Sequence, residues 1–184
     1  MLVFALGSLA LTPYLLRIGL KWADSDIADA DVTTRKSSGE RTAADALVIG
    51  IGPIGRRVVE LLDRRGQNVC AIDLSPANLH SIAVGAVRTV AGDAADLTTL
   101  ARAGANDADL AIVCVPDDDV AVRVVAALRR LNRRSAIIVR CRYLARREDA
   151  HRAGATAVVS EEEQIAEALL NILERPSSTS RPVR

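Results

Sequence analysis

The chain has 184 residues, of which 49% are hydrophobic but only 2% aromatic, so its core has to consist of aliphatic side chains. The 24 Lys and Arg residues nearly balance the 23 Asp and Glu residues, and the net charge of +1 excludes a strong overall attraction to nucleic acid or acidic substrates. The length suffices for one domain with its own core and for flanking segments.

The chain begins with an apolar stretch, residues 1–22, that carries no charge before Arg17. It lacks the basic start and the small-residue cleavage site of a secretory signal. Its apolar run is shorter than the roughly 20 residues that span a bilayer comfortably. Arg17 and Lys21 follow the run, as basic residues do on the cytoplasmic side of membrane helices. We predict a short, partial transmembrane helix with the following chain in the cytoplasm; a buried or amphipathic helix is the alternative.

Two further segments are predicted to lie outside any folded domain. Residues 23–44 are polar and rich in Asp, Ser and Thr, which indicates a linker. Residues 175–184 read RPSSTSRPVR, which is typical of a disordered tail. The remaining segment, residues 45–174, is the expected domain.

Within this segment, apolar runs alternate with amphipathic stretches. Strands are expected at residues 46–51, 68–74, 86–92, 108–115, 135–141 and 156–160. Helices are expected at residues 53–66, 76 to about 84, 96–104, 117–132, 142–154 and 161–173. Strands that are apolar on both faces and separated by helices indicate a parallel sheet covered on both sides. Six such units predict an α/β fold with a complete Rossmann-like, doubly wound sheet of order 3-2-1-4-5-6, preceded by the short apolar membrane-type helix.

The first predicted strand runs into a glycine-rich turn. Gly50, Gly52 and Gly55 form the pattern GxGxxG at the junction of strand and helix. The first glycine allows a tight turn, the second lets the backbone approach a pyrophosphate, and the third lets the helix pack on the strand. The helix N-terminus offers N–H groups and a positive dipole to phosphates, and Pro53 suits its first position. The pattern predicts a bound nucleotide.

An acidic residue ends each of the next two predicted strands. Asp73 lies 18 residues past Gly55 and can accept hydrogen bonds from both ribose hydroxyls. It would repel a 2′-phosphate, which favours NAD(H) or an adenosine nucleotide over NADP. Asp93 is expected to face the same crevice. Each carboxylate has a structural alternative, which is to cap the helix that follows.

Six segments follow one another in this order: VIGIGPIGRRVVELL, AIDLSP, VAGDAAD, ADLAIVCVPDDDVAV, IIVRCRY and AGATAVVSEE. Through these segments the chain resembles the TrkA-N domain over about residues 45–173. This domain is the nucleotide-binding N-terminal lobe of the RCK (regulator of K⁺ conductance) family. The stretch LALTPYLLRIG also resembles the end of the last membrane helix in Kef-type cation:proton antiporters, where a polar linker and the same lobe follow. The whole chain is thus similar to the C-terminal part of such a transporter.

The resemblance implies which residues contact the nucleotide. They are the glycine-rich turn with its neighbours, the ends of the second and third strands, and one residue near the end of each of the next two strands: Gly50, Ile51, Gly52, Pro53, Ile54, Gly55, Arg56, Asp73, Leu74, Asp93, Ala94, Val115 and Arg140. Asp93 and Ala94 would lie by the adenine. Val115 would line the crevice through its backbone, and Arg140 would reach a phosphate. Arg56 would either meet a phosphate or lie on a solvated helix face.

In two places the sequence departs from the family pattern. Relatives often have Arg where Pro53 stands, which removes one expected phosphate contact. They also often have Asn after the acidic run that opens the fourth helix, where this chain reads DDDVAV. The far half of the ligand is therefore less well defined by the resemblance than the adenosine half.

The resemblance further implies a regulatory role. The domain would bind NAD(H), ATP, ADP or AMP as a ligand and not as a redox reactant, and would control transport of potassium or another monovalent cation. It would work as a homodimer or higher oligomer at the cell membrane, on the cytoplasmic side, beside a transporter or channel subunit. Membrane contact would be made through residues 1–22, and no nucleic acid would be involved.

The sequence offers no constellation of catalytic or metal-binding residues near the turn. His80 and His151 have no Cys or His at ligand spacing and are expected at the surface. Cys70, Cys114 and Cys141 each lie in an apolar run and are expected to be buried free thiols. We therefore expect neither an enzyme nor a metal protein.

Other interpretations stay open beside this one. A truncated NAD-dependent oxidoreductase and a nucleotide-free assembly module are the two alternatives. The basic runs RRLNRR and RCRYLARR are typical of solvated helix faces, because no aromatic platform for bases accompanies them. Glu161, Glu162 and Glu163 open the last predicted helix, where the helix dipole accounts for them without a metal. The resemblance also admits a divalent-cation site there, since some family members bind such ions at their dimer interfaces.

Overall fold

The computed structural model of the protein describes residues 44–82 and 87–174. The predicted membrane-type helix at residues 1–22, nearly all of the linker at residues 23–44 and the tail at residues 175–184 lie outside the described residues. Within the described ranges, none of the helices combines the length and the apolar character that a membrane crossing requires.

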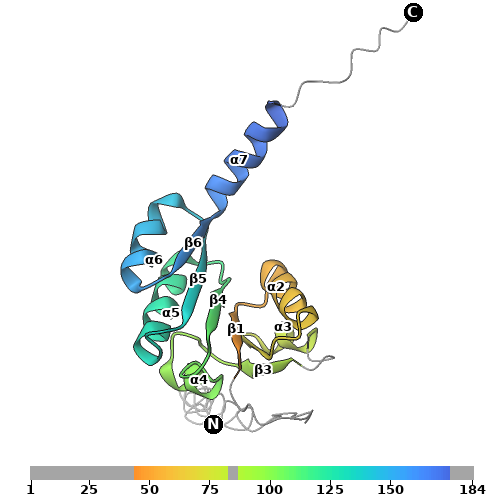
Figure 1. Ribbon diagram of the computed structural model, residues 1–184, viewed down its shortest axis with the longest axis vertical. Helices are drawn as coiled ribbons and strands as arrows, with labels where there is room; N and C mark the ends of the chain where they lie inside the picture. The colour runs from red at the N-terminus through yellow and green to blue at the C-terminus, as the bar shows by residue number, and fades with distance from the viewer. Residues whose placement is uncertain (1–43, 83–86, 175–184) are drawn as a thin grey trace, which may run out of the picture. The chain divides into compact units, whose positions relative to one another are not determined.

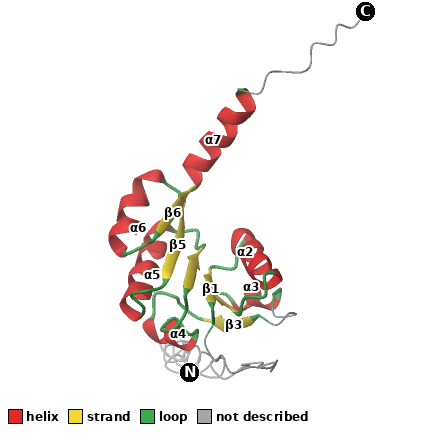
Figure 2. Ribbon diagram, viewed as in Figure 1, coloured by secondary structure: helices red, strands yellow, loops and turns green. Residues whose placement is uncertain are grey.

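Six parallel strands form one sheet in the order β3-β2-β1-β4-β5-β6, which confirms the predicted topology (Figure 2). The strands are β1 (Ala46–Ile49), β2 (Val69–Asp73), β3 (Arg88–Ala91), β4 (Leu110–Val113), β5 (Ala136–Cys141) and β6 (Ala157–Ser160). The chain adds strands outward from β1 to β3 and then crosses back to start β4 on the other side of β1. Ile49 at the end of β1 pairs with Val113 at the end of β4. The order of strands reverses between these two, and such a switch point is where ligands bind in folds of this kind.

Helices cover both faces of the sheet (Figure 1). The covering helices are α2 (Pro53–Arg64), α3 (Pro76–His80), α4 (Leu97–Arg102), α5 (Asp118–Leu131) and α6 (Arg147–Ala153), and a further helix, α7 (Glu161–Leu173), follows β6. The alternation of side chains along β1 separates two cores: Ala46 and Val48 pack in one with residues of α2, and Leu47 and Ile49 in the other with residues of α5. All four β1 side chains are buried, as expected for the central strand of a doubly covered sheet.

The helix α7 differs from the others because none of its residues is buried. It follows β6 directly, and its main contacts are with β6 and with the 3₁₀ helix η1 (Leu144–Arg146). Figure 1 shows it extending from the end of β6, away from the sheet. Its attachment to the domain therefore depends on its first turn.

One predicted helix ends earlier than expected. The helix from Pro76 was predicted to reach about Val84, but α3 ends at His80. The Ser81 hydroxyl donates to the Asn78 carbonyl at 2.9 Å, and the Ile82 N–H donates to the Leu79 carbonyl at 3.1 Å. These bonds tighten the last turn and compete with continuation of the α-helix. Residues 83–86 lie outside the described part.

Another predicted helix begins later than expected. Residues 142–154 were predicted as one helix, but the chain forms η1 first and then α6. The N–H groups of Arg142 and Tyr143 donate to the Asp118 carboxylate at 2.8 and 3.1 Å. The two residues therefore stay in a loop that is held from α5.

Candidate nucleotide-binding site

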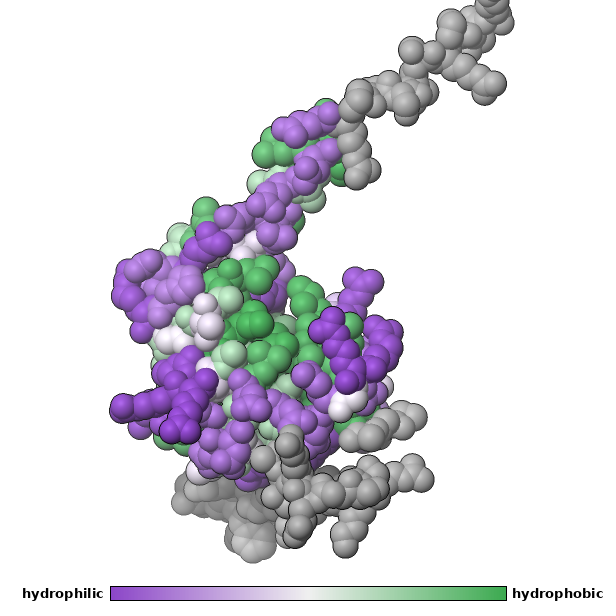
Figure 3. Space-filling view, viewed as in Figure 1, coloured by the Kyte–Doolittle hydropathy of each residue, from purple (hydrophilic) through white to green (hydrophobic). Residues whose placement is uncertain are grey.

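A cavity of about 610 Å³ opens at the carboxyl ends of the central strands. This volume is in the range of small-molecule sites. Its floor and walls come from the turn after β1, the ends of β2 and β3, the segment after β4, and Arg140 on β5. Figure 3 shows apolar surface over these strand ends, flanked by hydrophilic surface on the helices at either side. The cavity thus lies at the switch point of the sheet.

The turn after β1 has the backbone geometry that a phosphate-binding turn requires. Gly50 has a φ of +87°, and a Cβ there would lie 2.8 Å from the Val115 nitrogen. A Cβ on Gly55 would lie 2.0 Å from the Gly50 carbonyl oxygen, so only glycine lets α2 approach the turn this closely. Gly52 has no atom within 4 Å of its Cβ position. Two of the glycines therefore allow close packing, and the third leaves open space at the cavity.

The N-terminus of α2 points its backbone donors toward this space. Pro53 occupies the first turn, and no side chain caps the helix at Gly52. The first turn contains no acidic side chain that would compete with an anion for the helix dipole. Pro53 and Ile54 line the cavity. The arrangement offers N–H groups and positive dipole to a phosphate.

Asp73 links the end of β2 to both the turn and α3. Its Oδ2 accepts a hydrogen bond from the Ile51 N–H at 2.6 Å. Its Oδ1 accepts from the Ser75 N–H at 2.8 Å and from the Asn78 side-chain amide at 3.1 Å. The carboxylate thus contacts the start of α3 while lining the cavity, but the capping alternative is wrong, because the N-cap of α3 is Ser75 and no side chain caps this helix. A carboxylate has about four acceptor positions, so Asp73 retains capacity for a ligand hydroxyl.

Asp93 does not cap α4, and that alternative is wrong. The N-cap is Asp96, whose Oδ1 accepts from the Thr98 N–H at 3.2 Å. Asp93 instead accepts from the N–H of Ala95, the residue just before this N-cap, at 2.8 Å. Asp93 and Ala94 both line the cavity on the side of β3.

Arg140 lines the opposite end of the cavity and is tied to three acceptors. Its Nη1 donates to the carbonyl oxygens of Cys114 and Val115 at 3.5 and 3.3 Å. Its Nε lies 2.6 Å from Glu161 Oε1, at the start of α7. The hydrogen bond from Arg140 lowers the pKa of Glu161, and the same bond raises that of the guanidinium. Arg140 is the sole basic residue among the described residues that line the cavity.

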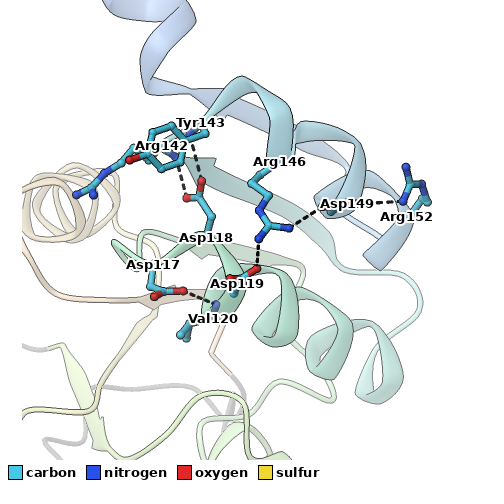
Figure 4. Close-up of polar contacts among 9 residues, drawn as sticks. All are labelled: Asp117, Asp118, Asp119, Val120, Arg142, Tyr143, Arg146, Asp149 and Arg152. Atoms are coloured by element: carbon cyan, nitrogen blue, oxygen red, sulfur yellow. Dashed lines mark hydrogen bonds and ion pairs between the residues drawn. The ribbon is translucent and has the colours of Figure 1, made fainter.

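The backbone that follows β5 is fixed by the first residues of α5 (Figure 4). Asp118 is only 9% exposed, and its two carboxylate oxygens accept from the N–H groups of Arg142 and Tyr143. Asp117 caps α5 by accepting from the Val120 N–H at 2.9 Å. The end of β5, and Arg140 with it, is therefore held relative to the segment after β4.

The cavity gathers most of the residues expected to bind a nucleotide. Those that line it are Gly50, Gly52, Pro53, Ile54, Asp73, Leu74, Asp93, Ala94, Val115 and Arg140. Three expected residues do not line it. Ile51 is buried beneath the turn, and Gly55 is buried where α2 meets the turn. Arg56 is turned back, with its Nε donating to the Ile51 carbonyl at 3.3 Å.

Further lining residues were not identified from the sequence: Ile49, Ile72, Asn78, Gly92, Cys114, Pro116, Asp117, Val120 and Val124. Asn78 could have been found, because it is five residues past Asp73, in the first turn of the following helix. Pro116 and Asp117 join β4 to α5, opposite the glycine-rich turn across the switch point. That position is itself a signal for ligand contact.

The three cysteines are buried and free, which confirms that expectation. Burial raises the pKa of the Cys70, Cys114 and Cys141 thiols. His80 and His151 are exposed, as expected. Among the residues that the structure describes, no group of three or more His, Cys, Asp or Glu side chains is arranged to hold a metal ion.

A doubly wound parallel sheet with a glycine-rich turn and a carboxylate at its switch point defines a nucleotide-binding domain of the Rossmann type. The family of TrkA-N domains matches residues 46–161. This match covers more than half of the chain, and the chain belongs to the TrkA-N domain family.

Solved structures with the same fold include domains of an inner membrane protein and of a channel. The TrkA-N domain of the inner membrane protein YbaL from Escherichia coli is 28% identical with a TM-score of 0.69, and the match covers 73% of this chain and 100% of that one. The Kef CTD from Shewanella denitrificans, in its AMP-bound form, is 27% identical with a TM-score of 0.60, covering 73% and 83%. The GsuK RCK domain is 29% identical with a TM-score of 0.62, covering 74% and 29%.

Two further solved structures and one curated relative are less similar to this chain or match less of it. The GsuK channel has been solved bound to NAD and to ADP, and at 21% and 20% identity with TM-scores of 0.59 these two structures show the shared fold alone. A curated relative, the chromoplastic capsanthin/capsorubin synthase of Capsicum annuum, is 30% identical over 67 residues. That match spans 36% of this chain and only 11% of the synthase.

Proposed function

We propose that this chain is a regulatory domain that binds NAD(H) or an adenine nucleotide and controls potassium or another monovalent-cation transport at the cell membrane. The nucleotide is a ligand in this proposal, and no hydride is transferred. Residues 45–174 form the nucleotide-binding domain on the cytoplasmic side. Residues 1–22 contact the membrane, residues 23–44 link the two, and residues 175–184 form a tail.

One observation carries the proposal: four features that suit different parts of a nucleotide lie in the cavity at the switch point. The glycine-rich turn and the α2 N-terminus suit a diphosphate. Asp73 suits ribose hydroxyls, and Arg140 supplies a positive charge at the far end. Apolar residues that include Leu74 and Val115 supply surface for a base.

The family supports the choice of ligand and of partner. The Kef CTD was solved with AMP, and the GsuK channel with NAD and with ADP. GsuK is a channel, and the sequence resembles Kef-type cation:proton antiporters, so we propose a membrane cation transporter or channel subunit as the partner. A homodimer or higher oligomer would let the ligand favour one domain arrangement over another and so shift a two-state equilibrium.

Thermal melting of the full chain with NAD, NADH, ATP, ADP, AMP, adenosine and NADP tests the ligand. A nucleotide at one hundred times its Kd contributes about 2.7 kcal/mol, which corresponds to a rise in Tm of roughly 5–10 °C for a domain of this size. NADP should give a smaller shift than NAD, because its 2′-phosphate meets the Asp73 carboxylate.

A folded protein whose Tm does not respond to any member of this panel would rule out the ligand. Incubation with NADH and a set of small carbonyl compounds separates the proposal from the oxidoreductase alternative. Steady consumption of NADH, lost in Asp73→Asn, would contradict a purely regulatory role. Assembly into stable oligomers without nucleotide affinity would favour the assembly module.

A further inference from the structure

The first turn of α7 is held to the domain by three consecutive glutamates. Each binds a different element, so the three contacts together fix the start of the helix. Glu161 pairs with Arg140 of β5 at 2.6 Å, Glu162 accepts from the Leu144 N–H of η1 at 2.8 Å, and Glu163 pairs with Arg147 of α6 at 2.7 Å. Because no residue of α7 is buried, these polar contacts are a large part of what orients the helix.

One of the three contacts reaches the nucleotide cavity. Arg140 lines the cavity, and Glu161, which does not line it, accepts from the Arg140 Nε. Both side chains are partly shielded from solvent, with exposed fractions of 17% and 29%. A phosphate in this half of the cavity meets no other basic side chain among the described lining residues.

We propose that Glu161 and a phosphate of the bound nucleotide compete for Arg140, so that phosphate binding loosens the first turn of α7. The proposal rests on the nucleotide-binding function proposed above and adds how occupancy of the site reaches α7. Glu161 is in this view a positioning residue that sets affinity for the charged part of the ligand.

The competition follows from charge and from linkage. A phosphate and the Glu161 carboxylate are both anions, and their mutual repulsion is weakly screened at a partly buried guanidinium. By linkage the effect is reciprocal: phosphate binding weakens the Arg140–Glu161 contact by the same free energy by which that contact weakens phosphate binding. Adenosine has no phosphate and should leave the contact unchanged.

The Glu161→Gln variant tests the affinity side of the proposal in the full chain. The change keeps the shape of the side chain and removes the charge. We expect the affinity for ADP to rise about three- to tenfold, with adenosine affinity changed by less than a factor of about two. Glu163→Gln is the matched control, because it removes the same charge from the same turn but its partner, Arg147, does not line the cavity.

Amide hydrogen exchange tests the coupling side. Saturating ADP should speed exchange in the first turn of α7 in the wild type, and adenosine should not. In Glu161→Gln the same amides should exchange quickly without ligand and respond little to ADP. Glu163→Gln should loosen α7 but keep the wild-type affinity for ADP.

The outcomes separate this proposal from the one it rests on. Weaker ADP binding by Glu161→Gln, or equal binding together with unchanged exchange in α7, overturns the competition and leaves nucleotide binding intact. If the wild type binds neither ADP nor any other nucleotide of the panel, both proposals fail together.

Discussion

Asp73 Oδ2 accepts a hydrogen bond of 2.6 Å from the backbone N–H of Ile51, 22 residues earlier in the chain. The carboxylate at the end of β2 is therefore joined to the glycine-rich turn after β1. Its other oxygen holds the Ser75 N–H and the Asn78 amide at the start of α3. The turn, the expected ribose contact and α3 form one connected unit before any ligand arrives, which lowers the cost of ordering the site on binding.

Replacing Asp73 with Asn tests this connection. The amide keeps one acceptor oxygen, but its NH₂ group replaces the second carboxylate oxygen and so faces N–H donors that it cannot accept from. We expect a loss of stability of about 1–3 kcal/mol, since hydrogen bonds to a charged group are stronger than neutral ones. Chemical denaturation measures the loss, and a nucleotide titration followed by Tm should show no shift.

Asp93→Asn is the control for that variant. Asp93 is exposed, and its carboxylate accepts only from the Ala95 N–H among the hydrogen bonds of the described chain, so removing the carboxylate charge should change stability by less than about 0.5 kcal/mol. Equal stability of the two variants would contradict the connecting role of Asp73.

Two glycines of the turn, Gly52 and Gly55, are expected to have different roles: one leaves space for the ligand, and the other lets α2 pack on the turn. Gly52→Ala should fold normally, because its Cβ meets no atom within 4 Å and its φ of −78° suits alanine. The added methyl would occupy space at the expected diphosphate position, so nucleotide affinity should fall at least about tenfold. Isothermal titration with the best ligand of the panel measures the fall, and an unchanged Kd would place the phosphates elsewhere.

Gly55→Ala should behave in the opposite way. Its Cβ would lie 2.0 Å from the Gly50 carbonyl oxygen, which is backbone and cannot rotate aside. We expect destabilisation of about 3 kcal/mol or more, as for other severe overpacking. Circular dichroism and thermal melting of the ligand-free protein report it, and a variant as stable as the wild type would show that α2 can move away from the turn.

The thiols offer a third prediction. Burial raises the pKa of Cys70, Cys114 and Cys141, so little thiolate is present at neutral pH and access is restricted. Fewer than one thiol per chain should react with a disulfide reagent within minutes at pH 7.5, and all three should react in denaturant. Cys114 lines the cavity, so its slow reaction should be slowed further by a bound nucleotide. Rapid native-state labelling would contradict the buried setting.

The strand positions and the turn were predictable because their signals are local, and the strand order follows from the fold type that this alternation indicates. Apolar runs at regular intervals indicate buried strands, and the spacing of Gly50, Gly52 and Gly55 fixes where the turn lies. Asp73 could be assigned because the fold brings the end of the second strand beside that turn. These residues line the cavity or lie directly under it.

Other features depend on partners that are distant in sequence. The late start of α6 arises because Asp118, on α5, binds the N–H groups of Arg142 and Tyr143 across 24 and 25 residues. The acidic start of α7 was predicted from the helix dipole alone, whereas Glu161 and Glu163 also bind arginines of β5 and α6. Arg56 was ambiguous because the direction of a long side chain on a helix surface follows from its contacts and not from its position in a motif.

The contact between Arg140 and Glu161 gives the last prediction, a dependence on pH. The hydrogen bond from Arg140 lowers the pKa of Glu161 in the folded protein relative to the unfolded chain. A depressed carboxyl pKa stabilises the folded contact at pH values above the ordinary value of about 4.3, and this contribution disappears as the pH falls through the folded-state pKa. Attachment of α7 should therefore be constant from about pH 7 to pH 5.5 and weaken below about pH 4.3.

Two measurements check this expectation. The side-chain carboxyl resonance of Glu161 should titrate at lower pH in the wild type than in Arg140→Met, where its hydrogen-bond donor is gone. Amide exchange in the first turn of α7, corrected for intrinsic pH dependence, should increase below pH 4.3 in the wild type and be independent of this titration in Glu161→Gln. Added salt should reduce the difference between the wild-type exchange rates at high and at low pH, because it screens a contact that is only partly buried. Identical midpoints in the wild type and Arg140→Met would show that the guanidinium does not hold Glu161 in solution, and α7 would then need another attachment.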